Sequence, residues 1–559
     1  LNSAYLGEIA GTADSPVKIT TQNEGLSDND TAVGVFVADG SNLERGVSHA
    51  NITAKSQGDF AVGIGVYGEN GTAHIGQIRD VDVKVSSERG RAVALLFDGN
   101  YTMDGSISGS FEVKSHGDVF GYSFGRDVSG WHSSSEGGIV FYNGNTKDST
   151  GLAIDYGNVR IDITSYGASS DAEGNSAYGA YVAEGIKLDN NFGFVGNVNT
   201  SGLGYGIYNC GEIGDLNLQA NVFAQGGAAY GIYAAGGNGD AFKSSISSLK
   251  EGGFIRVENN GSLGDAYGIY LDKGASIGNI AADLEVANAK RGYGIYVEQG
   301  ASVGDISGDI AISSNCELAY GIFNDGGSVG KFSGNFTFEV DGYALVYGKY
   351  DRLSDIPVGF FDITTGDSST FDISPSIRIV RAAENTQYTI HIDEYPETLD
   401  IKYDMEYGSG IFLAGGSKVV FSGEMKGVDI GIKATGAGTE VISVSGNINN
   451  DTLNRDISGS IFVEDGAKVT DITPTANIQG DVFISGAGSQ IVNFRPNYIK
   501  GNISISGEGA QIANFSPKSF KDSFVALENK ASIGVFDISG VSFVAVSYTH
   551  LRAHETRGN

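Results

Sequence analysis

The sequence predicts an all-β fold, a right-handed parallel β-solenoid (β-helix) with coils of about 21–27 residues. Three observations carry this prediction: a tyrosine-rich phrase that recurs along the chain, a second phrase that keeps step with it, and a composition rich in glycine and poor in proline. A period of 20–50 residues indicates an array of one small structural unit. It therefore takes precedence over any local pattern.

The first phrase, Tyr-Gly-Ile-Tyr or a close variant, recurs at intervals of 27, 25, 37, 26 and 27 residues. The second phrase, Ala-Ser-Ile-Gly or a close variant, recurs at intervals of 26 residues. The first phrase starts at Tyr178, Tyr205, Tyr230, Tyr267, Tyr293 and Tyr320, and the second is centred on Ile277, Val303 and Val329. The shared period indicates that both phrases belong to one repeating unit.

Each unit is predicted to consist of strands. The unit that starts at Tyr267 holds three short runs rich in Ile, Val, Leu and Tyr, and Gly, Asp, Asn and Lys separate these runs. Such separators favour turns, and no run has the length or the i, i+3, i+4 spacing of a helix. We expect one three-sided coil per unit, each strand pairing with its counterpart one coil on. At roughly 4.8 Å per coil, roughly 17–20 coils would span on the order of 80–100 Å.

The composition agrees with repeated turns and continuous strand pairing. Glycine contributes 84 of the 559 residues, and a coil with several corners needs residues that adopt positive φ without steric cost. Proline contributes only 7, as expected where every backbone N–H is needed for pairing. An apolar content of 40% is too high for a disordered low-complexity chain.

The repeats divide the chain into four parts. Residues 1–345 form a first solenoid array with an insertion near 121–176. Residues 346–410 break the pattern and are expected to form an irregular insertion, and residues 411–545 resume it with coils that shorten to 21 residues. Residues 546–559 carry no repeat and are predicted to be a non-native, adapter-derived tail. The chain also begins without Met, so we expect that the natural ends are missing.

The charge and the hydropathy exclude two classes of partner. The net charge is −31, from 67 acidic and 36 basic residues, and it repels nucleic acid and anionic membrane surfaces. No apolar stretch approaches 18 residues, so no transmembrane helix is expected. The charge also has a simpler interpretation, as the aspartates that many turns require.

The two cysteines are predicted to be free thiols. Cys210 and Cys316 belong to coils at least three repeats apart, or roughly 14 Å along a solenoid at roughly 4.8 Å per coil. A disulfide requires Cα atoms within about 7 Å of each other.

Short motifs give little support for catalysis. Residues Gly121–Gly125 match the G-x-S-x-G pattern of a hydrolase nucleophile, but that motif needs a following helix, and none is predicted. A Gly-Gly-Asn-Gly-Asp segment at Gly236 resembles a calcium-binding repeat but occurs only once, out of register. Aspartates such as Asp272, Asp305 and Asp325 recur at turn positions, which indicates a structural role. We expect no catalytic residue and no cofactor.

Two further segments are candidates for binding. Trp131 and His132 lie in the first insertion and are loop candidates for a binding site, although a loop whose Trp packs on the solenoid is the simpler interpretation. Asp393, Glu394 and Asp400 have the oxygen ligands that Ca²⁺ prefers. A solvated charge run explains these acids better, so no metal site is predicted.

The strongest site hypothesis concerns one face of the repeats. Because side chains alternate along a strand, Tyr267, Ile269 and Leu271 are expected inside, and Gly268 and Tyr270 outside. The outward aromatic residues would form a stacked, exposed ladder that binds a ligand. This ladder consists of Tyr181, Tyr208, Tyr233, Tyr270, Tyr296 and Phe323. Two alternatives stay open: the rings only shield the sheet, or the faces are reversed and the rings fill a wide core.

With its repeats, few cysteines, abundant glycine and acidic balance, the chain resembles the passenger region of Gram-negative autotransporters and related β-helical surface adhesins. The resemblance extends to about residue 545 and rests on the style of the repeats; no GDSG-type protease segment is present. It implies a secreted or cell-surface protein, anchored in the outer membrane through a C-terminal membrane barrel that this fragment lacks.

The resemblance implies a structural or adhesive stalk and no enzyme activity. Such a stalk would present loops or a sheet face to host or neighbouring cells, and its partner would be a cell-surface glycan or protein. The alternative is a carbohydrate-active enzyme, a polysaccharide lyase or a glycoside hydrolase, on the same scaffold. Clustered carboxylates with Lys or Arg in a cleft would favour the enzyme.

Overall fold

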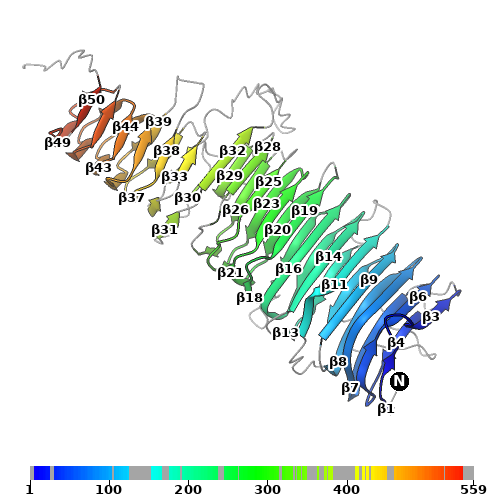
Figure 1. Ribbon diagram of the computed structural model, residues 1–559. Coiled ribbons are helices and arrows are strands. Elements are labelled where there is room, and N and C mark those ends of the chain that lie inside the picture. The colour runs from blue at the N-terminus through cyan, green and yellow to red at the C-terminus, as the bar shows by residue number, and fades with distance from the viewer. Residues whose placement is uncertain are drawn as a thin grey trace, which may run out of the picture. The chain divides into compact units, whose positions relative to one another are not determined.

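The chain is all-β wherever the structure describes it. The computed structural model describes residues 5–25, 31–58, 60–103, 106–124, 153–166, 176–188, 192–236, 244–261, 264–313, 318–330, 334, 336–340, 343–348, 362–363, 370–373, 376–381, 409–413, 418–421, 424–426, 430–449, 459–521, 523–539 and 541–544. No residue in these ranges lies in a helix. The strands are arranged in large parallel sheets (Figure 1). The all-β class and the parallel pairing predicted from the sequence are therefore confirmed.

The chain divides into two compact units. The first comprises Leu1–Tyr350 with Ile379–Thr386, and the second comprises Asp351–Arg378 with Gln387–Asn559.

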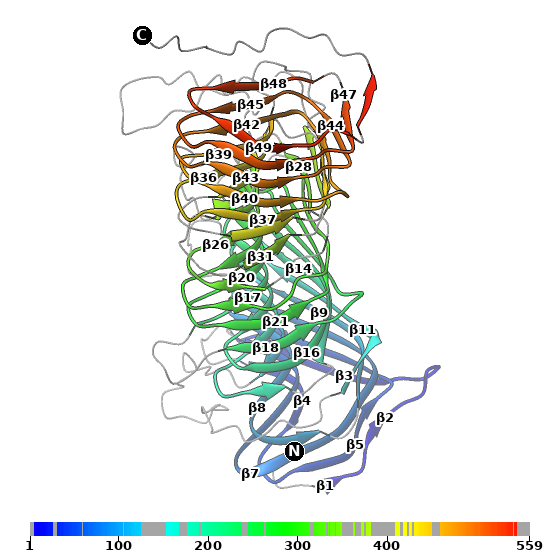
Figure 2. The same ribbon diagram turned by 90° about the vertical axis from the view of Figure 1, so that its left-hand side faces the viewer.

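In the first unit, the strands that carry the tyrosine-rich phrase pair with one another in parallel, each with its counterpart in the next repeat. We call them the ladder strands. They are β4 (Thr31–Val37), β7 (Phe60–Ser87), β8 (Arg91–Met103), β10 (Val119–Phe124), β12 (Ala177–Val182), β15 (Gly204–Asn209), β17 (Ala229–Ala234), β20 (Asp265–Leu271), β23 (Arg291–Val297), β26 (Leu318–Asn324) and β29 (Tyr343–Gly348). Figure 2 shows β17, β20 and β26 one above another.

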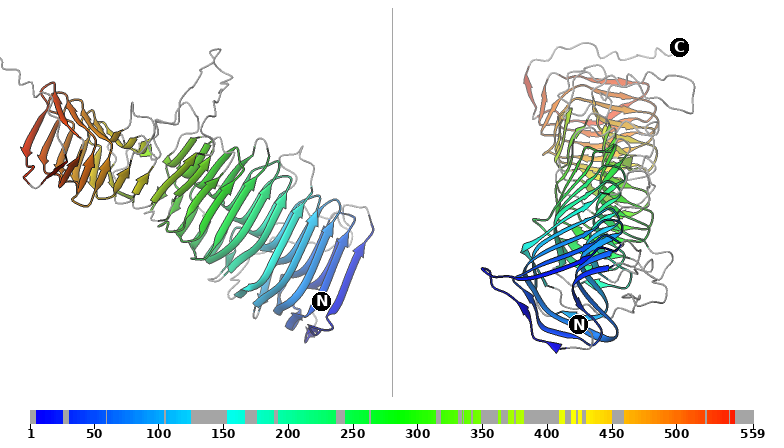
Figure 3. Two further views of the ribbon diagram at one scale, coloured as in Figure 1. Left: turned by 45° about the horizontal axis from the view of Figure 1, so that its top comes forward. Right: turned by 90° about the vertical axis from the view of Figure 1, so that its right-hand side faces the viewer.

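Two further series of parallel strands complete the repeats of this unit. One series consists of β3 (Val17–Asn23), β6 (Ala50–Ser56), β7, β9 (Ser106–Ser115), β11 (Ala153–Ser165), β14 (Phe192–Thr200), β16 (Glu212–Ala224), β19 (Phe254–Asn259), β22 (Asp283–Ala287), β25 (Ile310–Ser313) and β28 (Phe336–Val340). The other consists of β13 (Lys187–Leu188), β16, β18 (Ser245–Leu249), β21 (Ser276–Ile280), β24 (Ser302–Val303) and β27 (Ser328–Val329). The strands of this unit lie side by side in Figure 3.

The core of the first unit is a set of aliphatic columns. In β19 and β22 every second residue is buried, as period-two patterning requires. Ile255 and Val257 of β19 are fully buried, as are Ile269 and Leu271 of the ladder strand β20. Each of these residues lies in register with an aliphatic or small side chain of the next repeat, so stacking supplies the apolar contacts that one repeat cannot make alone.

A recurring turn follows the ladder strands. Gly274 and Gly300 have φ of +78° and +76° and occupy equivalent positions after β20 and β23. The turn is closed by backbone hydrogen bonds from Ala275 N–H to the carbonyl of Asp272 and from Ala301 N–H to the carbonyl of Glu298, both at 3.0 Å. These positions explain part of the high glycine content, because L-residues rarely adopt this conformation.

The second unit repeats the parallel scheme on a shorter period. Among its described residues, one seven-stranded sheet holds β30 (Asp362–Ile363), β33 (Ser409–Leu413), β36 (Ile430–Thr435), β39 (Gly459–Glu464), β42 (Asp481–Ser485), β45 (Ile503–Ser506) and β48 (Val525–Glu528). A second holds β31 (Thr370–Ile373), β34 (Lys418–Phe421), β37 (Glu440–Val444), β40 (Lys468–Ile472), β43 (Gln490–Phe494), β46 (Gln511–Phe515) and β49 (Ser532–Phe536).

Apolar columns also hold this unit together. Ile491 and Ile512 pair in register and are fully buried. The ring of Phe515 stacks between those of Phe494 and Phe536, with centroid distances of 5.3 and 4.9 Å. The interval of 21 residues seen in the sequence is therefore the interval at which identical side chains meet.

Candidate functional site

The candidate site is a double file of aromatic side chains on the ladder strands. Each ladder strand from β12 to β26 contributes two rings, three residues apart, and parallel pairing places each ring over the ring of the neighbouring ladder strand. The first column contains Tyr178, Tyr205, Tyr230, Tyr267, Tyr293 and Tyr320. The second column contains Tyr181, Tyr208, Tyr233, Tyr270, Tyr296 and Phe323.

Rings within each column are stacked nearly parallel. Successive centroids are 4.7–5.3 Å apart in the first column and 4.5–5.1 Å apart in the second. This spacing follows the distance of about 4.8 Å between paired strands. The stacked ladder that the repeats predict is therefore present.

Rings of the two columns meet edge to face. Tyr267 and Tyr270, for example, have centroids 5.2 Å apart and an interplanar angle of 89°. The same geometry recurs from Tyr178–Tyr181 to Tyr320–Phe323, with centroid distances of 5.1–5.6 Å. Edge-to-face and stacked contacts are both favourable for aromatic rings. The combined pattern makes the two columns one continuous aromatic layer.

The prediction for the faces of the strand is correct for three positions and wrong for two. Ile269 and Leu271 are buried inside, and the ring of Tyr270 lies half-buried at the surface. Tyr267 was expected inside with the aliphatic residues, but its ring packs against Tyr270 and lies on the same side. Gly268 was expected outside, but a Cβ there would meet Leu284 Cδ1 of the interior at 3.5 Å.

The reason for this error is the close approach of backbones at the glycines. A Cβ at Gly231 would lie 2.2 Å from Ile255 Cγ2 and 2.4 Å from the carbonyl oxygen of Gly268. Only glycine fits between the ladder strand and the opposing core. Strict alternation fails there, which brings two tyrosines three residues apart to one face.

Exposure differs between the columns. In the first column Tyr205, Tyr267, Tyr293 and Tyr320 are buried, whereas Tyr181, Tyr208, Tyr233, Tyr270 and Tyr296 of the second column are half-buried. Phe323 is only 1% exposed, so the predicted exposed ladder does not include it. The proposed ligand-binding role of the other ladder residues stays a prediction.

An aromatic ring also covers bare backbone in an earlier repeat, at the register position that the second column occupies further along the chain. Phe36 of β4 lies in register with Gly65 of β7. A Cβ at Gly65 would lie 2.9 Å from Phe36 Cδ2, so the ring occupies the space that the glycine leaves. This arrangement protects the exposed peptide of a strand glycine.

The hydroxyls of the two columns find partners near opposite ends of a ladder strand. Tyr267 donates to Oδ2 of Asp265 at 3.3 Å, and Asp265 also accepts from Nε of Arg291 at 2.9 Å. Tyr270 donates to Glu298 in the turn that follows the next ladder strand. Acidic side chains therefore border the aromatic layer on both sides.

Burial keeps the phenols protonated. It raises the pKa of Tyr230 to about 12, and the charge of Asp265 adds to the shift. Burial also raises the pKa of Tyr205, Tyr208, Tyr233, Tyr267 and Tyr270 well above the ordinary value of 10.0. The layer thus presents neutral hydroxyl groups at physiological pH.

A file of carboxyl groups borders the second column. Asp272, Glu298 and Asp325 each follow the second aromatic position by two residues, in three successive repeats. Burial raises the pKa of Glu298, and Asp272 raises it further, whereas the hydrogen bond from Tyr270 opposes the shift. Asp272 and Asp325 were predicted from the sequence as recurring turn residues, but Glu298 was not. The recurring acid two residues after the aromatic position was the available signal.

Cys210 lies beside the second column at the same turn position. It is a free thiol, and burial raises its pKa to about 11, although hydrogen bonds from Tyr208 and Tyr181 oppose the shift. A thiol with so high a pKa is a poor nucleophile. Cys316 lies outside the described residues.

The structure argues against a nucleophile at Ser123. This residue lies within strand β10 and is 1% exposed, in register with Leu96 and Tyr181. A hydrolase serine must be exposed at a turn between a strand and a helix. Trp131, His132, the Gly237–Asp240 part of the glycine-rich segment, Asp393, Glu394 and Asp400 lie outside the described residues.

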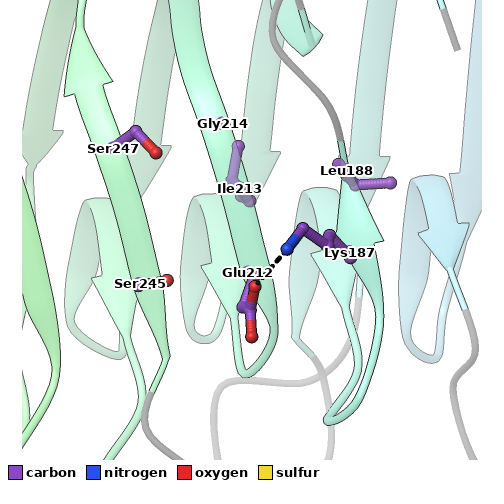
Figure 4. Close-up of a pocket in the computed structure, with 7 residues that line it drawn as sticks. All are labelled: Lys187, Leu188, Glu212, Ile213, Gly214, Ser245 and Ser247. Carbon is purple, nitrogen blue, oxygen red and sulfur yellow. Dashed lines mark ion pairs between the residues drawn. The ribbon is translucent and has the colours of Figure 1, made fainter. Parts of the chain in front are cut away.

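One shallow pocket of about 480 Å³ lies on the side of the repeats formed by β13, β16 and β18. Its lining is mostly polar, and Lys187 Nζ pairs with Glu212 Oε2 at 3.1 Å across adjacent strands (Figure 4). Ser245 and Ser247 form the opposite side. Glu212 is the only carboxylate in the lining, and it is 57% exposed. The pocket therefore lacks the pair of carboxyl groups that acid–base hydrolysis of a glycoside requires.

The described residues contain no group of three or more His, Cys, Asp and Glu placed to hold a metal ion. They also contain no helix with the length and apolarity needed to cross a bilayer.

Comparison of the chain with known protein families, with curated proteins and with solved structures found no match.

The aromatic layer should contribute measurably to stability. We expect Tyr233→Ala to destabilise the first unit, because it removes stacked contacts with Tyr208 and Tyr270 at 5.0 Å and an edge contact with Tyr230 at 5.3 Å. Each pair contributes about 0.5–1.5 kcal/mol. Tyr233→Phe keeps the ring and should change stability by less than about 1 kcal/mol. Urea denaturation measures both, and equal losses would show that the ring contacts do not matter.

The raised phenol pKa values predict loss of stability at alkaline pH. An unfolded tyrosine ionises near pH 10, whereas Tyr230 in the folded chain holds its proton to about pH 12. The folded state binds more protons in this window, so the free energy of unfolding falls as pH rises through it. A titration followed by tyrosinate absorbance and circular dichroism should show ionisation and unfolding together. Ionisation of the ladder tyrosines near pH 10 with the fold intact would contradict this.

Proposed function

We propose that the chain is a right-handed parallel β-solenoid that serves as a structural and adhesive stalk, secreted or held at the cell surface, of the autotransporter-passenger type. The observation that carries this proposal is the uninterrupted double file of aromatic rings from Tyr178 to Phe323, which repeats one surface over successive strands. A surface that repeats with the scaffold suits contact with an extended or multivalent partner. An enzyme, in contrast, needs one unique constellation of residues.

The described residues give the enzyme alternative little support. A glycoside hydrolase needs two carboxyl groups roughly 5–9.5 Å apart on either side of the scissile bond. The pocket beside β16 holds one carboxylate, Glu212, and an ion pair with Lys187 occupies it. Asp272 and Glu298 follow the paired residues Leu271 and Val297, so they lie side by side in successive repeats and not on opposite sides of a cleft.

The solenoid is tested by removing whole repeats. Deleting residues 267–319 joins Ala266 of β20 to Tyr320 of β26, which occupies the position equivalent to Tyr267, so every remaining residue keeps its register. We expect an unchanged circular dichroism spectrum and a particle about 10 Å shorter by X-ray scattering, since each repeat adds about 4.8 Å. Deleting residues 267–305 as a matched control breaks the register and should abolish cooperative unfolding. Equal tolerance of both deletions would contradict the proposal.

Adhesion is tested with particles. Fluorescent beads coated with the chain should bind to bacterial or epithelial cells in larger numbers than beads coated with a helical protein of similar negative charge. Release by an excess of the free chain would show that binding is specific. Adhesion that matches the charge control would refute the adhesive function while leaving the fold untouched.

A further inference from the structure

The tyrosine rings of the two columns form a continuous series of contacts. In the first column, five successive steps of 4.7–5.3 Å between ring centroids lead from Tyr178 to Tyr320. Electron transfer weakens steeply with distance, so several short steps between neighbouring rings are favoured over one long step. Each ring in this column is also a phenol, which loses an electron far more easily than the ring of phenylalanine does. The column therefore has the spacing and the chemistry to pass on the electron vacancy that a one-electron oxidation leaves.

Contacts between the columns give a vacancy two ways past each ladder strand. Tyr205 lies 5.0 Å from Tyr230 in its own column and 5.9 Å from Tyr233 in the other column. Beyond β17, Tyr230 lies 4.9 Å from Tyr267, and Tyr233 lies 5.0 Å from Tyr270. Either ring of β17 thus connects the strands on its two sides. Removing one phenol from β17 leaves a route open, whereas removing both interrupts the layer.

Carboxyl groups beside the second column can take the proton that oxidation of a phenol releases. A phenol that has lost an electron is a strong acid, and Tyr270 already donates a hydrogen bond to Glu298. Asp272 occupies the equivalent position beside Tyr233, because the N–H groups of both acids bond to the preceding ladder strand in the same way. Burial raises the pKa of Tyr233, and the charge of Asp272 raises it further, which shows how near this carboxyl group lies. A proton acceptor therefore accompanies successive rings.

We propose that the aromatic layer conducts one-electron oxidising equivalents from one repeat to another. Its reaction partners are one-electron oxidants, such as a peroxyl radical or a trivalent ruthenium complex. They reach the half-buried rings of the second column first, and the buried rings of the first column share the vacancy. This activity is independent of the proposed adhesive function.

Each step balances electrons and protons. The oxidant takes one electron from Tyr270 and is reduced, the phenol O–H bond breaks, and the proton goes to the carboxylate of Glu298. Tyr270 is then a neutral phenoxyl radical. In the next step Tyr233 gives Tyr270 one electron, and Glu298 returns its proton to the Tyr270 oxygen, where the O–H bond forms again. Tyr233 releases its own proton to Asp272 and carries the radical.

The test starts an oxidation at one end of the layer and detects it at the other, on the whole chain. Both cysteines are replaced, by Cys210→Ser and Cys316→Ser, and a ruthenium polypyridyl complex is attached to Gln299→Cys, an exposed position in the turn after β23. A light flash, with a cobalt(III) ammine as electron acceptor, produces trivalent ruthenium there. A nitroso spin trap marks the radical, and peptide mass spectrometry locates the adducts. We expect adducts on the half-buried Tyr181 and Tyr208, beyond β17.

Substitutions in β17 test the route. Tyr230→Phe and Tyr233→Phe each leave one phenol on this strand, so each single variant should keep the yield of distal adducts within twofold of the parent. The double variant keeps the rings but removes both phenols, and it should lower the yield at least fivefold. A matched control, Tyr166→Phe with Tyr498→Phe, removes two hydroxyls outside the layer and should behave like the parent.

A second interruption, Tyr267→Phe with Tyr270→Phe, repeats the test on β20 and replaces the first if that double variant does not fold. It should lower the distal yield by the same factor. Adducts confined to Tyr293 and Tyr296, on the ladder strand that precedes the label, would show that the oxidation does not migrate. Distal adducts at the parent level in both interrupted variants would show that the oxidant travels by diffusion. Either result would overturn the proposal.

Discussion

Parallel pairing in register places each residue of a repeat over the residue at the same position in the next repeat. Aliphatic and aromatic side chains gain from this arrangement because identical groups pack together. Charged side chains do not gain from stacking on identical neighbours, and at several paired positions the chain places opposite charges across from each other. Arg256 faces Glu285, Lys468 faces Glu440, and Asp265 faces Arg291 across paired strands, with N–O distances of 2.5–3.0 Å. Opposite charges directly across a pair stabilise a sheet, whereas like charges oppose it.

The acids beside the second column are an exception to this rule. Asp272 and Glu298 lie in successive repeats, and burial raises the pKa of Glu298, with the neighbouring Asp272 raising it further. The hydrogen bond from Tyr270 partly compensates for it. Because the repeat recurs, half-buried carboxyl groups follow one another at the same position after successive ladder strands.

The sequence predicted the all-β class, the parallel pairing and the stacking of the tyrosines, because a shared period fixes which residues meet. It also predicted that Ile269 and Leu271 face inward and Tyr270 outward. It misplaced Tyr267 and Gly268 because alternation along a strand assumes a regular pleat. The departure depends on how closely Gly231 approaches Ile255, which is a tertiary contact that no pattern within one strand reveals. The burial of Phe323 depends equally on its three-dimensional surroundings.

The stacked phenols also give the molecule an optical property. Rings that lie nearly parallel at about 5 Å exchange excitation energy far faster than they emit, so light absorbed by one tyrosine migrates along its column before emission. Migration within a column keeps the polarisation because the rings are parallel, whereas transfer to the edge-to-face rings of the other column depolarises the emission even in a rigid molecule. Fluorescence anisotropy thus reports, without any label, whether the columns of the first unit are intact.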